Sequence, residues 1–446
     1  MMPKSLRLIL LSLRDLLVSA GPVLALAVGL LMAAYWWLDP QPPTRVVLAT
    51  GPADSAYANF GRRYAKALEA DGIEVVEKRT DGSLDNLTLL RRGDVDVAFV
   101  RGGSADPAAD EEAGLVSLGA LFYEPLWIFV RKDAVPAAAA SGQGAGALVQ
   151  LKNLRVNVDK SGSGVPQLVD QLLRANHLDP ATMKLSHLEP APAAEALLGG
   201  MLDAVVLASA PQSRQVQQLL RAPDVLLMDV QQAEAYVRRF GYLQSVTLPR
   251  GVVDLAADLP PHDVTLLAAT TSLLSREQTH PALRELFAKS AQSIHSAGGW
   301  FNRARDFPNT RTSELPVSPE GDRAINGTPP FWQRYLPFWA SNLFERMWLV
   351  LGGLLVLMLP LSRVVPPLYQ FRVRSRVFRW YARLRDIEQR GGAGDTPEPL
   401  LRELDELEAR VNKVTVPLSY ANELYELRAH IRAARLRLTA HAEVAP

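Results

Sequence analysis

The chain has 446 residues, a formal net charge of +1 and a hydrophobic content of 48%. This length is enough for two or three domains with cores of their own. The near-neutral charge gives no general attraction for nucleic acid. Because the chain contains no cysteine, disulfides, thiolate catalysis and cysteine-ligated metals are excluded. The hydrophobic residues are unevenly distributed, and two long apolar runs divide the chain into parts.

The first apolar run, Leu16–Leu38, contains 23 residues and no charge. A helix that crosses a bilayer core needs about 20 such residues. Basic residues precede the run and aromatic residues close it at Tyr35–Trp37, as at a membrane interface. The alternative is a cleavable signal peptide, whose apolar region spans about 7–15 residues before an A-x-A-like site. The length favours an uncleaved transmembrane helix at residues 16–38, after a cytoplasmic N-terminus at residues 1–15.

The second apolar run, Met347–Ser362, is shorter, and seven arginines without any acidic residue follow it between Arg363 and Arg385. It predicts a transmembrane helix at residues 345–367, and the alternative is a buried or interfacial helix. By the positive-inside rule, both chain ends are then cytoplasmic and residues 44–335 lie on the other side of the membrane.

Residues 44–335 alternate predicted strands with predicted helices. The first strands are expected at Arg45–Thr50, Ile73–Lys78 and Asp94–Arg101, with helices at Tyr57–Ala70 and Asp85–Arg92 between them. This alternation predicts an α/β domain with a mostly parallel sheet, in which ligands bind at the carboxyl ends of the strands.

A weak internal repeat predicts two lobes of similar construction. A strand, a polar turn and a helix recur at residues 154–176. The pattern G-x-x-D followed by apolar residues occurs at Gly93–Phe99 and again at Gly200–Val206. Residues 246–274 are strand-rich and are expected to cross back to the first lobe, before a helix at residues 280–297.

The C-terminal part, residues 371–446, has apolar residues in steps of three and four. These residues are Leu400, Leu404, Leu407, Val411 and Val414, and then Leu424, Leu427, Ile431, Ala434 and Leu438. The two stripes predict a cytoplasmic helical hairpin or a short coiled coil.

No residue pattern supports catalysis or metal binding. The seven histidines form no H-E-x-x-H motif, and no G-x-x-x-x-G-K-[ST] motif is present. Gly162-Ser163-Gly164 does not satisfy G-x-S-x-G, because residue 161 is a serine. The spaced glycines at residues 137–148 follow an alanine run and are interpreted as a loop. We therefore expect a binding protein without enzymatic activity, metal or cofactor.

Two polar turns, Gly51–Tyr57 and Ser161–Gly164, each lead into a predicted helix. A helix N-terminus presents free N–H groups and the positive end of the helix dipole, and therefore attracts anions. The alternative is that a serine or aspartate in each turn simply caps its helix. Small residues fill nearly every position of both turns, which favours a close approach of the backbone to a ligand. We expect the two turns to face one cleft.

Seven short motifs follow one another along residues 44–310. They are Ala49-Thr50-Gly51, Thr80-Asp81-Gly82-Ser83, Arg92-Gly93-Asp94-Val95-Asp96, Tyr123-Glu124-Pro125-Leu126, Lys152-Asn153-Leu154-Arg155-Val156, Ser161-Gly162-Ser163-Gly164 and Gly200-Met201-Leu202-Asp203-Ala204. In this order the chain resembles the solute-binding proteins of the TAXI family, which serve TRAP transporters (tripartite ATP-independent periplasmic carriers). The resemblance implies a two-lobed fold of the periplasmic-binding-protein type II-like class, with a small organic anion, a carboxylate above all, as ligand.

The chain departs from the family at two places. Pro52, Ala53, Asp54 and Ala56 stand in a turn that is richer in glycine in the family. Arg101 stands at a strand end where the family tends to have a glutamine. An arginine there would pair bidentately with a carboxylate, and the alternative is an arginine that points to solvent.

The candidate ligand-binding residues combine the two turns with polar and aromatic residues near strand ends. They are Thr50, Gly51, Ser55, Tyr57, Ser83, Asn86, Arg101, Tyr123, Ser161, Gly162, Ser163, Gly164 and Ser209. The turns would supply backbone donors, and Tyr57, Tyr123 and Trp127 would form walls.

The predicted architecture is a two-lobed α/β binding domain between two transmembrane helices, with a cytoplasmic helical tail. The first functional hypothesis is a solute receptor anchored in a bacterial inner membrane, with its binding domain in the periplasm and a TRAP-type permease as partner. The second is a ligand sensor that signals through residues 371–446 to a cytoplasmic partner. A membrane enzyme has the least support.

Overall fold

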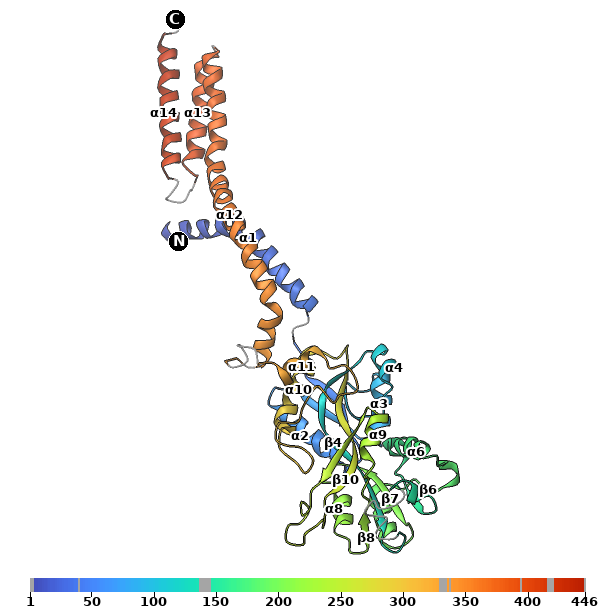
Figure 1. Cartoon of the computed structure of the whole chain (residues 1–446). Coiled ribbons are helices and arrows are strands. Elements are labelled where there is room, and N and C mark those ends of the chain that lie inside the picture. The colour runs from blue at the N-terminus through green and yellow to red at the C-terminus, as the bar shows by residue number, and fades with distance from the viewer. Residues whose placement is uncertain are drawn as a thin grey trace. The chain divides into compact units, whose positions relative to one another are not determined.

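The computed structural model describes residues 4–38, 41–135, 146–328, 335–336, 338–393, 395–414 and 421–444. Contacts divide the chain into a larger unit, Gln41–Leu343, and a smaller unit made of Met1–Pro40 and Phe344–Pro446. Both are drawn in Figure 1. The expected loop at residues 137–148 lies for the most part outside the described residues. We describe each unit by itself.

The first lobe of the larger unit is built on three parallel strands in the order β2-β1-β3. They are β1 (Arg45–Ala49), β2 (Glu74–Lys78) and β3 (Val97–Arg101), connected by α2 (Ala56–Glu69) and α3 (Ser83–Arg92). The short helix α4 (Pro107–Glu112) follows β3. The alternation of strands and helices predicted from the sequence is confirmed here.

The second lobe repeats this arrangement with three parallel strands in the order β7-β5-β6. They are β5 (Arg155–Asn157), β6 (Lys184–Ser186) and β7 (Ala204–Ala208), connected by α6 (Val165–Ala175) and α7 (Pro190–Leu198). The lobe also contains single-turn helices at Val149–Leu151, Ser161–Ser163 and Pro180–Thr182, and then α8 (Arg214–Leu220), β8 (Val225–Leu227) and α9 (Ala233–Arg239).

The repeated G-x-x-D pattern has the same structural role in both lobes. The Asp96 carboxylate accepts a hydrogen bond from the backbone N–H of Val47 in β1 at 2.8 Å. Asp203 accepts the equivalent bond from Arg155 in β5, also at 2.8 Å. In each lobe the aspartate directly precedes the third strand and accepts a hydrogen bond from a backbone N–H of the first strand, which would otherwise lack a partner. The predicted two-lobed repeat is confirmed.

Two long antiparallel strands, β4 (Leu115–Arg131) and β10 (Val264–Arg276), join the lobes at the centre of the sheet (Figure 1). The complete order is β2-β1-β3-β10-β4-β7-β5-β6, with β8 paired to β4 and β9 (Leu243–Leu248) paired to β10. The expected crossing by residues 246–274 is confirmed. The sheet is mixed rather than mostly parallel, because both connecting strands run against their neighbours.

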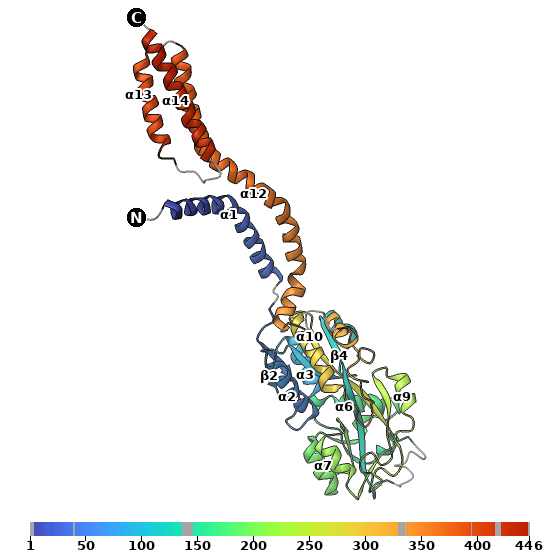
Figure 2. The same cartoon turned by 90° about the vertical axis from the view of Figure 1, so that its left-hand side faces the viewer.

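Each lobe has its own apolar core. In the first lobe, Leu48, Tyr64 and Phe99 pack with Phe287 of α10 (Pro281–His295), and all four side chains are fully buried. Figure 2 shows α10 beside α2 and β4, in agreement with their contacts. In the second lobe, α6 packs on the sheet through residues such as Leu172. The short helix α11 (Pro319–Asn326) packs against α10. Separate cores allow the lobes to move as two bodies about the two central strands.

The smaller unit contains α1 (Lys4–Leu38) and, from Phe344 on, α12 (Phe338–Gly392). Among the described residues, these two helices are long and apolar enough to cross a membrane. Large apolar side chains on both are exposed in this structure, including Met32 and Trp36 on α1 and Leu355 on α12. α12 continues through three prolines without ending, which transmembrane helices tolerate.

Two helices of the tail pack together as the expected hairpin, and the end of α12 packs against them as a third helix. Helices α13 (Pro397–Val411) and α14 (Ala421–Val444) pack together, as both apolar stripes predict. Val377, Leu384 and Ile387 from the end of α12 complete their core. The arginines of this segment conceal its few apolar positions in the sequence, which is why the third helix was not predicted.

Candidate functional site

A cavity of about 250 Å³ lies between the two lobes, at the carboxyl ends of β3 and β7. Here the first lobe means residues 44–122 and 270–328, and the second lobe means residues 123–269. The first lobe contributes Pro52–Tyr57, Asp81, Gly82, Ser83 and Arg101 to the lining, and the second contributes Glu124, Asp159, Lys160, Ser163, Val165, Glu189–Ala191, Leu207–Ser209, Ser213 and Gln215. The volume is slightly below the range of about 300–1,000 Å³ that is typical of ligand pockets.

Arg101 ends β3, and its side chain is 2% exposed. Its guanidinium makes no hydrogen bond or ion pair with any residue that the structure describes, and its Nε is completely buried. Gly164 of the second lobe lies against it, because a Cβ on that glycine would be 2.9 Å from a terminal nitrogen of the guanidinium. A buried cation without a partner is costly, so this site favours an anionic group from outside the protein.

Glu124, on the crossing strand β4, is the buried acid of the cavity. Its Oε2 accepts hydrogen bonds from the Tyr57 hydroxyl at 2.9 Å and the Thr271 hydroxyl at 3.0 Å. The Tyr57 hydroxyl is also 3.0 Å from the hydroxyl of Ser83. Ser83 in turn accepts the backbone N–H of Arg101 at 3.1 Å. This network ties α2, α3, β3 and both crossing strands together on one side of the cavity.

Burial is the largest influence on the pKa values of Glu124 and Asp159. It raises the pKa of Glu124, while the charge of Arg101 and the bonds from Tyr57 and Thr271 act in the opposite direction. Burial also raises the pKa of Asp159, which the backbone N–H of Lys160 partly opposes through a 2.8 Å bond. The pKa of Tyr57 is raised mainly by burial and secondarily by Glu124. Tyr57 therefore remains a neutral hydrogen-bond donor.

Residues of both polar turns line the same cavity, and the serine of the first turn also caps its helix. Ser55 is the N-cap of α2 and accepts the N–H of Ala58 at 3.2 Å. Ser163 accepts the N–H of Val165 at 3.2 Å and donates to the carbonyl of Lys160 at 2.8 Å. Both serines line the cavity, so at Ser55 capping and contact with the cavity coexist.

Contact between the two lobes requires glycine at positions 82 and 162, which the sequence did not reveal. A Cβ on Gly82 of the first lobe would be 2.9 Å from the Cα of Ser163 in the second lobe. A Cβ on Gly162 would be 2.5 Å from the Cβ of Asp81. Gly82 also has φ +137°, which only glycine adopts readily. These glycines allow the lobes to touch beside the cavity.

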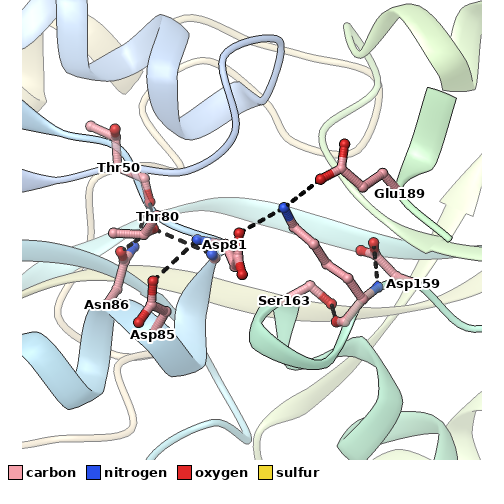
Figure 3. A network of polar contacts seen from close by, with 10 residues as sticks. Thr50, Thr80, Asp81, Asp85, Asn86, Asp159, Ser163 and Glu189 are labelled. Carbon is pink, nitrogen blue, oxygen red and sulfur yellow. Dashed lines mark hydrogen bonds and ion pairs between the residues drawn. The ribbon is translucent and has the colours of Figure 1, made fainter. Parts of the chain in front are cut away.

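Lys160 connects the lobes by ion pairs, which are drawn in Figure 3. Its amine lies 2.7 Å from Asp81 of the first lobe and 2.9 Å from Glu189 of its own lobe. The Lys160 side chain is 18% exposed, whereas those of both acids are more than half exposed. Only the pair with Asp81 spans the two lobes, and it therefore favours the closed arrangement.

Asn86 lies behind the cavity in a buried polar network (Figure 3). Its amide donates to the carbonyl of Thr50 at 2.6 Å and to that of Phe99 at 2.8 Å. Thr80 donates to the Asn86 side-chain oxygen at 2.6 Å. The network holds the end of β1 against α3 and β3, and so fixes the turn that begins at Gly51.

The structure brings together Ser55, Tyr57, Ser83, Arg101, Ser163 and Ser209 in the cavity lining. The other candidate residues lie outside this lining. They are Thr50, Gly51, Asn86, Tyr123, Ser161, Gly162 and Gly164. Tyr123 packs edge-on against Phe307, with ring centroids 4.9 Å apart. Trp127, expected to form a wall, is fully buried and donates to the carbonyl of Ser209 at 2.8 Å.

The candidate residues from the sequence omit six charged residues of the cavity lining: Asp54, Asp81, Glu124, Asp159, Lys160 and Glu189. Neighbouring side chains of a strand point to opposite faces, so Tyr123 and Glu124 cannot both face the cavity. Nothing in the local sequence tells which face is the inner one. Among the described residues, no group of histidines and acids is arranged to hold a metal ion.

Comparison with known proteins gives a family and a set of similar structures. The model of the NMT1-like family matches residues 48–303, more than half of the chain. Similar structures include the alkanesulfonate-binding protein SsuA from Xanthomonas axonopodis pv. citri bound to MOPS, with 14% identity, a TM-score of 0.35, and coverage of 65% of this chain and 86% of that one.

Two further neighbours have similarly low identity. The periplasmic aliphatic sulphonate binding protein SsuA from Escherichia coli has 14% identity and a TM-score of 0.35, over 65% of this chain and 84% of that one. The effector-binding domain of BenM with its effector benzoate has 12% identity and a TM-score of 0.37, over 57% of this chain and 92% of that one. The ligands named here belong to those proteins.

Proposed function

The chain belongs to the NMT1-like family and has the two-lobed α/β fold of the periplasmic-binding-protein type II-like class. From this premise we propose that the protein is a membrane-anchored extracytoplasmic receptor for a small organic ligand with an anionic group. The observation that carries the proposal is the buried guanidinium of Arg101 beside a cavity between two lobes. A ligand carboxylate would complete its hydrogen bonding. The lobes would close over the ligand by a hinge in β4 and β10.

Membrane anchoring rests on two observations. Both α1 and α12 contain apolar windows of sufficient length, and basic residues flank them on the sides predicted to be cytoplasmic. In this arrangement the binding domain faces the periplasm of a bacterial inner membrane and both termini are cytoplasmic. The TAXI resemblance adds a TRAP-type permease as the partner that would receive the solute.

The direct test is ligand binding by the full-length protein in detergent. Small organic acids should raise its melting temperature, and isothermal titration should give a saturable affinity. Arg101→Gln should lower the affinity for a carboxylate ligand by about tenfold or more, because it removes a charged donor from a buried site. Arg311→Gln, outside this cavity, is the matched control. An unchanged affinity in Arg101→Gln would refute the assignment of the anion site.

A second candidate function, ligand sensing, is favoured by the form of α12. This helix runs without interruption from the apolar segment into the core of the tail bundle. A plain anchor needs no folded tail. Deletion of residues 371–446 should leave solute uptake intact in a transport receptor, whereas in a sensor it should abolish the cellular response to the ligand. Measuring uptake and response in the same deletion strain distinguishes the two.

A further inference from the structure

The charges of the cavity do not match a ligand that is only an anion. Among the described residues, five acidic side chains line it and only two basic ones do. The acids are Asp54, Asp81, Glu124, Asp159 and Glu189, and the bases are Arg101 and Lys160. Lys160 is already paired with two of these acids. Among the described lining residues, Arg101 is therefore the one cation that is available to a ligand. Three lining acids, Asp54, Glu124 and Asp159, are not paired with Lys160.

Two of these acids are buried in the cavity wall, as Arg101 is. Glu124 is 7% exposed and Asp159 is 6% exposed. Both protein hydrogen bonds that Glu124 accepts end on Oε2, and its Oε1 accepts none from the described residues. That oxygen is not among the fully buried atoms without a partner, so it is open to the cavity that Glu124 lines. Asp159 lies close enough to affect the titration of Glu124.

We propose, resting on the receptor function above, that the ligand is a zwitterion of amino-acid type: its carboxylate pairs with Arg101, and its ammonium group pairs with the open oxygen of Glu124, supported by Asp159. An ammonium group donates three hydrogen bonds, and the carboxylates of Glu124 and Asp159 are buried acceptors for it in the cavity wall. A ligand with only negative charge would add to the unbalanced charge of the two buried acids, which low polarity makes unfavourable.

The test compares matched ligands on the full-length protein in detergent. The probes are the common amino acids; for each one that binds, the second probe is the hydroxy acid with a hydroxyl in place of the amine, and the third is the amine without the carboxylate. We expect an amino acid to bind and both partial analogues to bind about tenfold more weakly or worse, because each leaves one buried charge unpaired.

Variants then assign the two charges to residues. Glu124→Gln keeps an oxygen that can accept from Tyr57 and Thr271, so it should fold while it loses most of the preference for the amino acid over the hydroxy acid. Arg101→Gln should instead remove the preference for the amino acid over the amine. Asp159→Asn is the second acid variant, and Glu111→Gln, on the exposed surface of α4, is the control.

The outcomes separate this inference from the receptor function. If a hydroxy acid or a dicarboxylate binds as tightly as the amino acid, the zwitterion proposal is wrong and the receptor function stands. The same holds if neither Glu124→Gln nor Asp159→Asn changes the preference while both variants melt as the parent does. If no amino acid and no organic acid binds, both proposals fail.

Discussion

The ion pair between Lys160 and Asp81 predicts a measurable contribution to lobe closure. Asp81→Asn removes the only one of the two Lys160 pairs that joins the lobes. Exposed ion pairs contribute about 0.2–1 kcal/mol. Because Lys160 is mostly shielded while Asp81 is more than half exposed, we expect a value near the upper end of that range. Since 1.4 kcal/mol is a tenfold change in an equilibrium constant, the closed-to-open equilibrium constant should fall by about two- to fivefold.

The apparent ligand affinity should fall by up to the same factor, because it scales with the fraction of protein in the closed state, which completes the cavity. Titration calorimetry at low and high salt measures this loss. High salt should weaken binding by the parent and narrow the difference from Asp81→Asn, because salt screens an exposed pair. Glu189→Gln breaks the pair within one lobe and should cause a smaller loss or none. Glu234→Gln breaks an exposed pair with Arg238 outside the cavity and is the control.

Closure itself can be measured by distance. The chain has no cysteine, so two introduced cysteines would be the only sites for a pair of distance-reporting spectroscopic labels. Suitable exposed positions are Glu111 of the first lobe and Met201 of the second. Asp81→Asn should shift the distribution of distances towards open forms without ligand. If Asp81→Asn and Glu189→Gln reduce affinity equally, or neither changes the distances, the pair does not hold the lobes together and our reasoning is refuted.

Three further predictions follow from the same contacts. Gly162→Leu or Gly164→Leu should abolish the ligand-induced thermal shift while the free protein still unfolds cooperatively, because these side chains would meet Asp81 and Arg101 between the lobes; an unchanged shift would contradict the closed geometry. Glu124→Gln should gain stability relative to the parent in thermal melts as the pH rises above the ordinary carboxyl pKa. The parent's raised pKa means that its stability is greatest below the ordinary carboxyl pKa and decreases as the pH rises through the raised value. Leu404→Ala, at a fully buried position, should cost the tail about 2–5 kcal/mol in chemical unfolding and leave ligand affinity as it is; a weaker affinity would show that the tail influences binding.

Local patterns in the sequence were enough for much of the architecture. The alternation of strands and helices, the two lobes and the apolar stripes of the tail all follow from periodicity, because burial of one face imposes a fixed spacing. The repeated G-x-x-D was also readable, since Asp96 and Asp203 each satisfy a strand backbone nearby in the fold. The two apolar helices follow from length and composition alone.

Other features required the tertiary structure. The direction of β4 and β10 depends on pairing between distant segments, and with it the choice of Glu124 over Tyr123 for the cavity. The glycines that sequence patterns assigned to a ligand allow the two lobes to touch, which no single segment can reveal. The burial of Arg101 near Glu124 and Asp159 arises only when segments far apart in the sequence converge. Spacing along the chain determines which faces are buried, but the charge balance of a cavity is set by residues far apart in sequence.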